Sequence, residues 1–260
     1  MPDPDLNVIE LGETGPLVAF CHGLFGQGRN WMQIGKELSQ TYRVLLVDMP
    51  DHGRSAWTDA VDYLAYADRV AGLFSADDPV TLVGHSMGGK IAMTLALQHP
   101  ELVARLCVVD VAPVTYDNTR EFTGYVRAMR ALDLASLDSR ADADSAMKAD
   151  VPDDRVRSFL LQNLRRDGGA WRWQMNLEVL GDHLPDLGGW PADRLGGTTY
   201  DGRVLWVGGD RSSYVTAEHA EAMDRWFPRN RRVTIKGAGH WVHSERPETF
   251  LAVLRHFLDG

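Results

Sequence analysis

Short runs of apolar residues recur along the chain, separated by longer polar and amphipathic stretches. Within each run the apolar residues are continuous, as in strands buried on both faces of a parallel sheet. Six such strands are predicted, at residues 17–23, 42–50, 79–86, 105–113, 202–210 and 231–240. Helices are predicted between and after them, at residues 30–39, 61–76, 87–99, 216–227 and 247–259. This alternation predicts an α/β fold, an open and mostly parallel sheet flanked by helices, with function at the carboxyl ends of the strands.

The alternation is interrupted after residue 113, where no strand is recognisable and the patterns are helical. We therefore expect an inserted helical cap at residues 114–190, and a core made of residues 1–113 and 191–260. The cap is predicted to contain amphipathic helices in FTGYVRAMRALDL and RVRSFLLQNLRRD. The polar tract ADADSAMKADVPDD is expected to be a mobile connection within it.

Composition limits the classes of function. The 260 residues fit one domain with an insertion, and the net charge of −9 with scattered Lys and Arg disfavours nucleic-acid binding. Cys21 and Cys107 lie in apolar runs and are expected to be buried free thiols. The N-terminus lacks the features of a signal peptide, and no apolar run is long enough to span a membrane. We therefore expect a cytoplasmic protein, with no membrane association.

A G-x-S-x-G motif, formed by Gly84, Ser86 and Gly88, stands between a predicted strand and a predicted helix. This is the context in which a serine nucleophile is displayed on a tight, strained turn that tolerates only small neighbours. The N-terminus of the following helix also supplies partial positive charge near a developing anion. Ser86 is therefore the predicted nucleophile.

A serine nucleophile needs a base, and His240 is the best candidate among nine histidines. It follows the last predicted strand in the sequence GAGHW, whose small residues allow a tight loop beside the nucleophile. His85 is expected to be a spacer within the motif, and His22 and His52 to shape loops. His243 is expected to support the site from its rim.

The oxyanion formed during attack needs two backbone N–H donors. One is predicted to be Met87, which follows the nucleophile, and the other Leu24 in the HGLFG turn, with Phe25 as second choice. The side chains of Leu24, Phe25 and Met87 are then expected to line an apolar substrate pocket together with the cap residues Trp171 and Trp173. Packing between cap and core is the alternative role of the two tryptophans.

Five segments in order resemble the α/β-hydrolase superfamily, and more narrowly the small bacterial esterase group typified by YbfF. They are HGLFGQGRNW, DMPDHGRS, VGHSMGGK, VVDVAPVTY and GAGHWVHSERPETF. The resemblance implies an α/β-hydrolase fold with a helical cap, and a carboxylesterase or thioesterase activity that needs no cofactor. No cluster of His, Asp and Glu has the spacing of metal ligands, so no metal is expected either.

The acid partner of His240 is predicted to be Asp110, with Asp210 as the fallback. In many α/β-hydrolases the acid lies three residues after a glycine that ends the strand following the cap. Counted from Gly209, that position is Ser212, so Asp210 falls short. The resembled esterase group carries its acid in the VVDVAP motif, which places the role on Asp110. An aspartate in so apolar a run also needs a partner such as an imidazole N–H.

The sequence thus predicts a serine hydrolase that cleaves small-molecule carboxylic esters, or thioesters, of short to medium acyl chains through an acyl-enzyme. The same triad also serves carbon–carbon bond hydrolases, acyltransferases and perhydrolases, which remain alternatives. A non-catalytic small-molecule-binding protein on the same fold is a further one. Haloalkane dehalogenases and epoxide hydrolases are disfavoured, because their chemistry needs a carboxylate at the position of Ser86.

Overall fold

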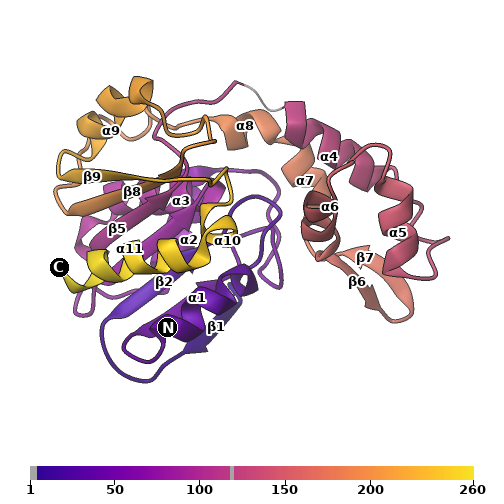
Figure 1. Cartoon of the computed structure of the whole chain (residues 1–260), viewed down its shortest axis with the longest axis horizontal. Coiled ribbons are helices and arrows are strands. Elements are labelled where there is room, and N and C mark those ends of the chain that lie inside the picture. The colour runs from indigo at the N-terminus through magenta and orange to yellow at the C-terminus, as the bar shows by residue number, and fades with distance from the viewer. Residues whose placement is uncertain (1–4, 118–119) are drawn as a thin grey trace.

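A seven-stranded sheet forms the centre of the computed structural model, which describes residues 5–117 and 120–260 (Figure 1). Residues 1–4 of the N-terminal stretch and residues 118–119 of the predicted cap lie outside the described residues. The strand order is β1-β3-β2-β4-β5-β8-β9, and only β1 is antiparallel to its neighbour. The strands are β1 Val8–Leu11, β2 Leu17–Cys21, β3 Arg43–Val47, β4 Val80–His85, β5 Val103–Val109, β8 Arg203–Gly209 and β9 Asn230–Ile235. The predicted mostly parallel α/β sheet is confirmed, and β1 is added at its edge.

Helices cover both faces of the sheet. One face packs against α2 (Tyr63–Ala71), α3 (Met87–Gln98) and α9 (Ala220–Trp226), and the other against α1 (Met32–Leu38) and α11 (Pro247–Asp259). Helix α3 is buried along almost its whole length, because it lies between the sheet, α2 and the cap. The short helix α10 (Val242–Glu245) and the 3₁₀ turns η1 (Gly28–Trp31), η2 (Pro100–Leu102) and η3 (Ala217–His219) complete the core.

The elements between β5 and β8 lie to one side of the sheet, over the carboxyl ends of its strands (Figure 1). They are α4 Arg120–Arg130, α5 Arg140–Met147, α6 Asp154–Leu161, β6 Leu164–Asp167, β7 Ala170–Trp173, α7 Leu177–Asp182 and α8 Leu184–Gly188. Among the described residues, no helix combines the length and apolar character needed to cross a bilayer.

Two expectations for this region are wrong. Strands β6 and β7 form an antiparallel hairpin where none was expected, closed by Gly168 and Gly169 with φ of 58° and 90°. Positive φ at both turn residues suits a two-residue hairpin loop, and the strands escaped notice because they are polar and half-exposed rather than continuously apolar. The tract expected to be mobile instead contains α5, whose start is fixed by a capping box between Ser139 and Asp142.

Buried amides join this region to the core. Asn163, fully buried between α6 and β6, donates from Nδ2 to the Phe25 carbonyl oxygen at 2.7 Å and accepts at Oδ1 from Gln27 Nε2 at 2.5 Å. Asn176 donates to Asp51 Oδ1 at 2.8 Å. Because buried polar groups are costly to leave unpaired, these contacts fix where the cap elements sit over the sheet.

Candidate active site

The serine of the G-x-S-x-G motif lies at the turn between β4 and α3. Ser86 has a φ of 52° and a ψ of −120°, a backbone conformation that a non-glycine residue adopts only under strain. A Cβ at Gly84 would lie 2.4 Å from the Gly88 carbonyl oxygen, and one at Gly88 would lie 2.4 Å from that of Cys21. Because no larger side chain fits at either glycine, the turn stays tight and displays the serine hydroxyl at the end of the sheet.

The imidazole of His240 contacts both that hydroxyl and a carboxylate. Its Nε2 lies 3.1 Å from Ser86 Oγ, and its Nδ1 lies 2.7 Å from Asp110 Oδ2. Asp110 follows β5, is fully buried, and also accepts hydrogen bonds from the Gly209 N–H and the Ser212 hydroxyl. A carboxylate held in this way favours the tautomer with hydrogen on Nδ1, which leaves Nε2 free to accept the serine proton.

Asp210 lies away from the imidazole. It is exposed, and its Oδ1 accepts a hydrogen bond from the Gly237 N–H at 2.7 Å. Ser212, three places after Gly209, does reach the site, where its hydroxyl donates to Asp110. The loop after β8 therefore supports the carboxylate at the end of β5 instead of supplying one of its own.

Three buried histidines shape the loops around the site. His22 Nε2 accepts the Met49 N–H at 2.9 Å, His52 Nε2 accepts the Phe25 N–H at 3.2 Å, and the His85 ring contacts the His240 carbonyl oxygen at 2.9 Å. Burial lowers the pKa of His22 to about 3, and it also lowers the pKa of His52 and of His85. All three rings are therefore neutral near pH 7 and act through hydrogen bonds.

The two residues predicted to donate to the oxyanion come from different segments: Leu24 lines both pockets at Ser86, and Met87 follows Ser86 directly in the chain. Met87 is the first residue of α3, so its amide belongs to the turn whose N–H groups have no acceptor within the helix. The N–H of Phe25, the second choice for an oxyanion donor, is already donated to His52. Phe25 also has a positive φ of 61°, which bends the chain sharply after Leu24.

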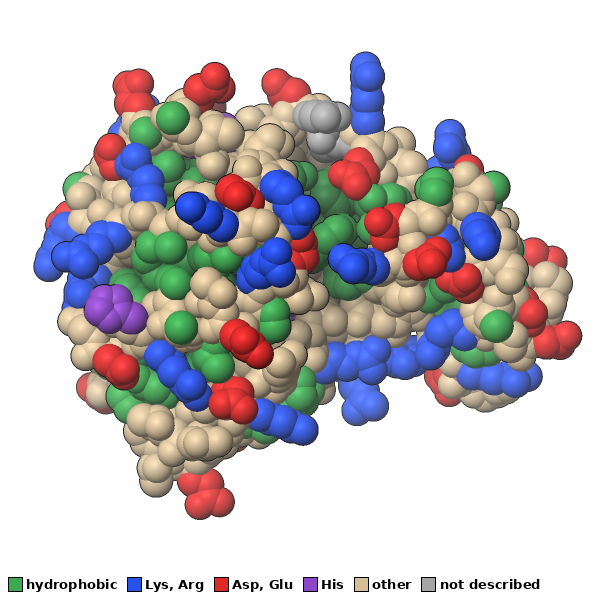
Figure 2. All heavy atoms as spheres, in the orientation of Figure 1, with side chains coloured by type: hydrophobic (Ala, Val, Ile, Leu, Met, Phe, Trp, Pro, Cys, Tyr) green, Lys and Arg blue, Asp and Glu red, His purple; other side chains and the backbone are tan. Residues whose placement is uncertain are grey.

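Two pockets meet at Ser86, with Leu24 and Phe122 shared between them. The apolar pocket is lined by Met87, Val111, Leu184 and Leu187, with Lys90, Tyr116 and Tyr214 on its walls. The histidine-side pocket is lined by Phe25, Phe159, His240, Trp241 and His243. It continues into an outer pocket with Arg155, Arg211 and Arg246 on its walls. In Figure 2, charged side chains surround hydrophobic ones in the hollow between the central sheet and the elements that join β5 to β8.

Trp171 and Trp173 line neither of the pockets at Ser86, so their expected place there is wrong. Both lie on β7 of the outer hairpin. Trp171 donates from Nε1 to the Leu137 carbonyl oxygen at 2.9 Å, and the Arg166 guanidinium lies over its ring. The tryptophans pack among the elements between β5 and β8, because they lie on a half-exposed strand and not on a helix that faces the core.

The sequence interpretation missed several residues that line the site. Tyr214 stacks on the His240 ring, with centroids 4.2 Å apart, and Phe122 lines both pockets. Their positions follow from the loop after β8 and from the cap, for which the sequence has no motif. Lys90 did carry a signal: it is the one charged residue in MGGKIAMTLALQ, and it follows Ser86 by four residues, one turn of the helix.

A family model described as alpha/beta hydrolase fold matches residues 16–247. The chain belongs to this family. Among its curated relatives, the sn-1-specific diacylglycerol lipase ABHD11 of Mus musculus is 36% identical over 260 residues, covering 97% of this chain and 84% of the relative. Esterase YbfF of Escherichia coli (strain K12) is 32% identical over 244 residues, covering 93% and 92%. The predicted resemblance to YbfF is confirmed.

Among solved structures, this α/β-hydrolase is similar to a marine microorganism esterase. The two superimpose with a TM-score of 0.92 at 30% sequence identity, over 97% of this chain and 99% of the other. The agreement extends over almost the whole length of both chains, so it includes the elements between β5 and β8 as well as the sheet. These relatives are named as esterases or as a lipase, and their names support ester hydrolysis as the reaction class.

Proposed function

We propose that this α/β-hydrolase is a serine hydrolase that cleaves carboxylic esters of short to medium acyl chains through an acyl-enzyme. The observation that carries the proposal is the unbroken relay from Ser86 Oγ through both ring nitrogens of His240 to Asp110. The esterase and lipase names of the relatives support the same reaction class. In this proposal Ser86 is the nucleophile, His240 the general base and Asp110 the acid.

In the first half of the reaction, His240 Nε2 takes the proton of the Ser86 hydroxyl as Oγ attacks the ester carbonyl carbon. The oxyanion that forms is positioned to accept hydrogen bonds from the Leu24 and Met87 N–H groups. The same imidazole then gives its proton to the departing alkoxide, so that alcohol leaves and an acyl-Ser86 ester remains. Water, activated by His240 in turn, hydrolyses that ester and restores the serine.

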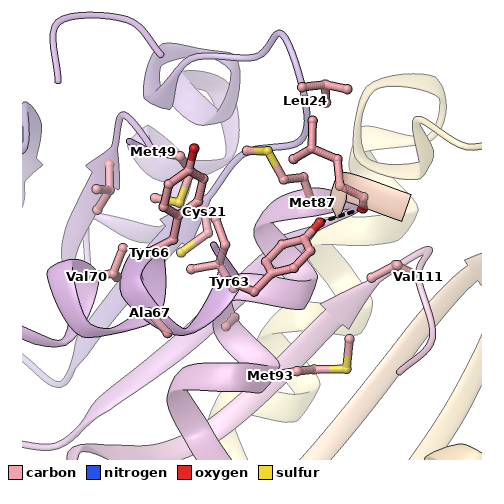
Figure 3. Close-up of a cluster of buried hydrophobic side chains, with 14 of the residues drawn as sticks. Cys21, Leu24, Met49, Tyr63, Tyr66, Ala67, Val70, Met87, Met93 and Val111 are labelled. Carbon is pink, nitrogen blue, oxygen red and sulfur yellow. Dashed lines mark hydrogen bonds between the residues drawn. The ribbon is translucent and has the colours of Figure 1, made fainter. Parts of the chain in front are cut away.

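The two pockets take different parts of the substrate. His240 must deliver a proton to the leaving oxygen, so the alcohol occupies the pocket that His240 and Trp241 line. The acyl chain then extends into the apolar pocket, whose walls include Met87 and Val111 from the core (Figure 3). Leu184 and Leu187 of the cap close it from the other side, which supports a preference for acyl chains of limited length.

The test combines covalent labelling with turnover. A fluorophosphonate probe should label the wild-type protein at Ser86, and a p-nitrophenyl butyrate assay should show hydrolysis; Ser86→Ala should abolish both while the circular dichroism spectrum is unchanged. A series of acyl lengths, offered as esters and as thioesters, should give its best kcat/KM at short to medium chains. Labelling that persists in Ser86→Ala would refute the nucleophile. A protein that binds esters without turning them over would support the non-catalytic alternative.

A further inference from the structure

Lys90 is a buried basic side chain that lines the apolar pocket. Only 2% of its surface is exposed, and its Nζ donates to the carbonyl oxygens of Gly188 and Gly189 at 2.6 and 2.5 Å. The rings of Tyr116 and Tyr63 lie below it, with centroids 5.0 and 5.7 Å from Nζ. An ammonium has three N–H groups, so these two carbonyls leave one donor unused.

No carboxylate balances this charge within residues 5–117 and 120–260: the contacts of Nζ are two neutral carbonyls and two aromatic faces. A buried charge without a partner of opposite sign is strongly disfavoured, and proteins normally pair it. Burial accordingly lowers the pKa of Lys90 to about 7. Such an uncompensated charge in a substrate pocket marks a place where a ligand completes the pairing.

Lys90 and the nucleophile Ser86 lie close enough for one acyl group, bound to Ser86, to reach Lys90. Lys90 lies in the first turn of α3, four residues after Ser86, and its backbone N–H donates to the Ser86 carbonyl oxygen at 3.1 Å, so both residues lie at the same end of the helix. Both residues line the apolar pocket. An acyl chain bound to Ser86 would therefore run across a few carbons of apolar wall before its far end meets the ammonium.

We propose that the apolar pocket selects acyl groups that end in a carboxylate, so that monoesters of short dicarboxylic acids are preferred substrates and Lys90 determines that preference. The proposal rests on the ester hydrolysis proposed above and names its acyl class. The substrate carboxylate would accept the unused N–H of Lys90 and supply the missing negative charge. A neutral chain of the same length would leave the buried cation unpaired.

The preference should depend on pH in one direction. The carboxylate is ionised throughout the range from pH 6 to 9, and only the protonated amine attracts it. The other titratable groups facing Lys90 are Tyr63 on α2 and Tyr116 after β5, and burial raises the pKa of both phenols, so they stay neutral. Preference for the acid should therefore be greatest below pH 7 and decline above it as Lys90 loses its proton.

The experiment compares the ethyl monoester of succinate with ethyl succinamate, a neutral ester of nearly the same shape in which an amide replaces the free carboxylate. The corresponding pairs of glutarate and adipate esters test longer chains. For the best-fitting pair at pH 6.5, wild-type enzyme should favour the acid in kcat/KM by about tenfold or more, as expected for one charge-assisted hydrogen bond. Since both members of a pair use the same triad, their ratio cancels the titration of the catalytic groups. Above pH 7 the ratio should fall towards one.

Lys90→Met should reverse the ratio, because a carboxylate would then enter an apolar pocket with no partner. Lys90→Gln, which keeps N–H donors for the cap carbonyls but has no charge, should also lose the preference and guards against a folding defect in the first variant. Tyr63→Phe is the matched control. The Tyr63 hydroxyl donates to the neighbouring Leu187 carbonyl oxygen at 2.8 Å (dashed line in Figure 3), so its loss removes a cap contact without touching the charge and should preserve the ratio.

In every pair, the ester with a terminal amide could be hydrolysed as fast as the ester with a terminal carboxylate, or the preference for the carboxylate could survive in both Lys90 variants. Either result would overturn the inference and leave the proposed function intact. Refusal of both substrates by enzyme that hydrolyses p-nitrophenyl butyrate would overturn it in the same way. Failure to hydrolyse any ester would instead overturn the proposed function, and with it this inference.

Discussion

At the scale of the residue, Asp110 and Asp210 follow neighbouring strands yet lie in opposite surroundings. Asp110 is fully buried and contacts His240 Nδ1 at 2.7 Å, whereas Asp210 is exposed and holds the Gly237 N–H. A carboxylate on the base fixes the imidazole tautomer and stabilises the imidazolium formed during attack. An exposed carboxylate in a loop can only order that loop.

Exchanging each acid for its amide should separate these roles. Asp110→Asn keeps the shape of the side chain, so we expect kcat to fall roughly 10³- to 10⁴-fold with little change in KM, a loss of about 4 to 5.5 kcal/mol of transition-state stabilisation. Asp210→Asn should cost at most about tenfold. Steady-state kinetics on p-nitrophenyl butyrate measures both, with thermal denaturation to verify folding. A larger loss in Asp210→Asn than in Asp110→Asn would show that the acid is misassigned.

Single residues could be predicted where their role requires a recognisable pattern among the neighbouring residues in the sequence. Ser86 and His240 stand among glycines and small residues that tight turns require, and Asp110 interrupts an apolar strand, so each was visible in the sequence. Trp171 and Trp173 were misplaced because an aromatic residue suits a pocket and a packing surface equally. Tyr214 acts through a ring stacked on His240, a contact between segments that no local pattern encodes.

At the scale of the element, continuous apolar runs were sufficient to predict the parallel strands, since β2, β4, β5 and β8 are buried on both faces and only the edge strand β9 is largely exposed. The same criterion missed β1 and the β6–β7 hairpin, whose strands are short and partly exposed. It also missed α5, where a capping box starts a helix in a tract of polar residues. Elements that a single local interaction stabilises are harder to recognise than those a large core stabilises.

The substitution Asn163→Ala tests whether the hydrogen bonds of Asn163 hold the HGLFG turn, which contains the proposed oxyanion donor Leu24. Asn163→Ala would remove the Asn163 partner of the Phe25 carbonyl oxygen and leave Gln27 Nε2 with only its longer contact to the Gln162 carbonyl oxygen at 3.5 Å. Because these groups are buried, the free energy of unfolding should fall by about 1 to 3 kcal/mol, and kcat/KM should fall about tenfold as Leu24 shifts. Gln162→Ala is the control: Gln162 also bridges to Asn30 at 2.8 Å but is only half-buried, so water can replace its contacts. Equal urea denaturation midpoints for the two variants would contradict this account.

At the scale of the whole molecule, buried neutral histidines link stability to pH. Burial lowers the pKa of His22 and of His243 to about 3, and lowers the pKa of His52 and His85 as well. In the unfolded chain a histidine titrates near pH 6.5. Between about pH 6.5 and 3, the unfolded state therefore binds protons that the folded state refuses, and the free energy of unfolding decreases as the pH falls.

The size of this effect can be predicted and assigned to one ring. His22 and His243 together should lower the free energy of unfolding by about 4 kcal/mol between pH 7.5 and pH 5, with a slope that approaches roughly 1.4 kcal/mol per group and pH unit below pH 6.5, and the full stability should be present well above pH 6.5. His243 stacks on Trp31 with centroids 4.0 Å apart, and its Nδ1 has no hydrogen-bond partner among the described residues. Phenylalanine can therefore replace the ring. Urea denaturation of His243→Phe from pH 7.5 to 5 should show a shallower decline than wild type, by about one proton. If the two proteins lose stability in parallel, or if neither loses any, the folded protein accepts protons at these rings and the buried histidines do not set its stability in acid.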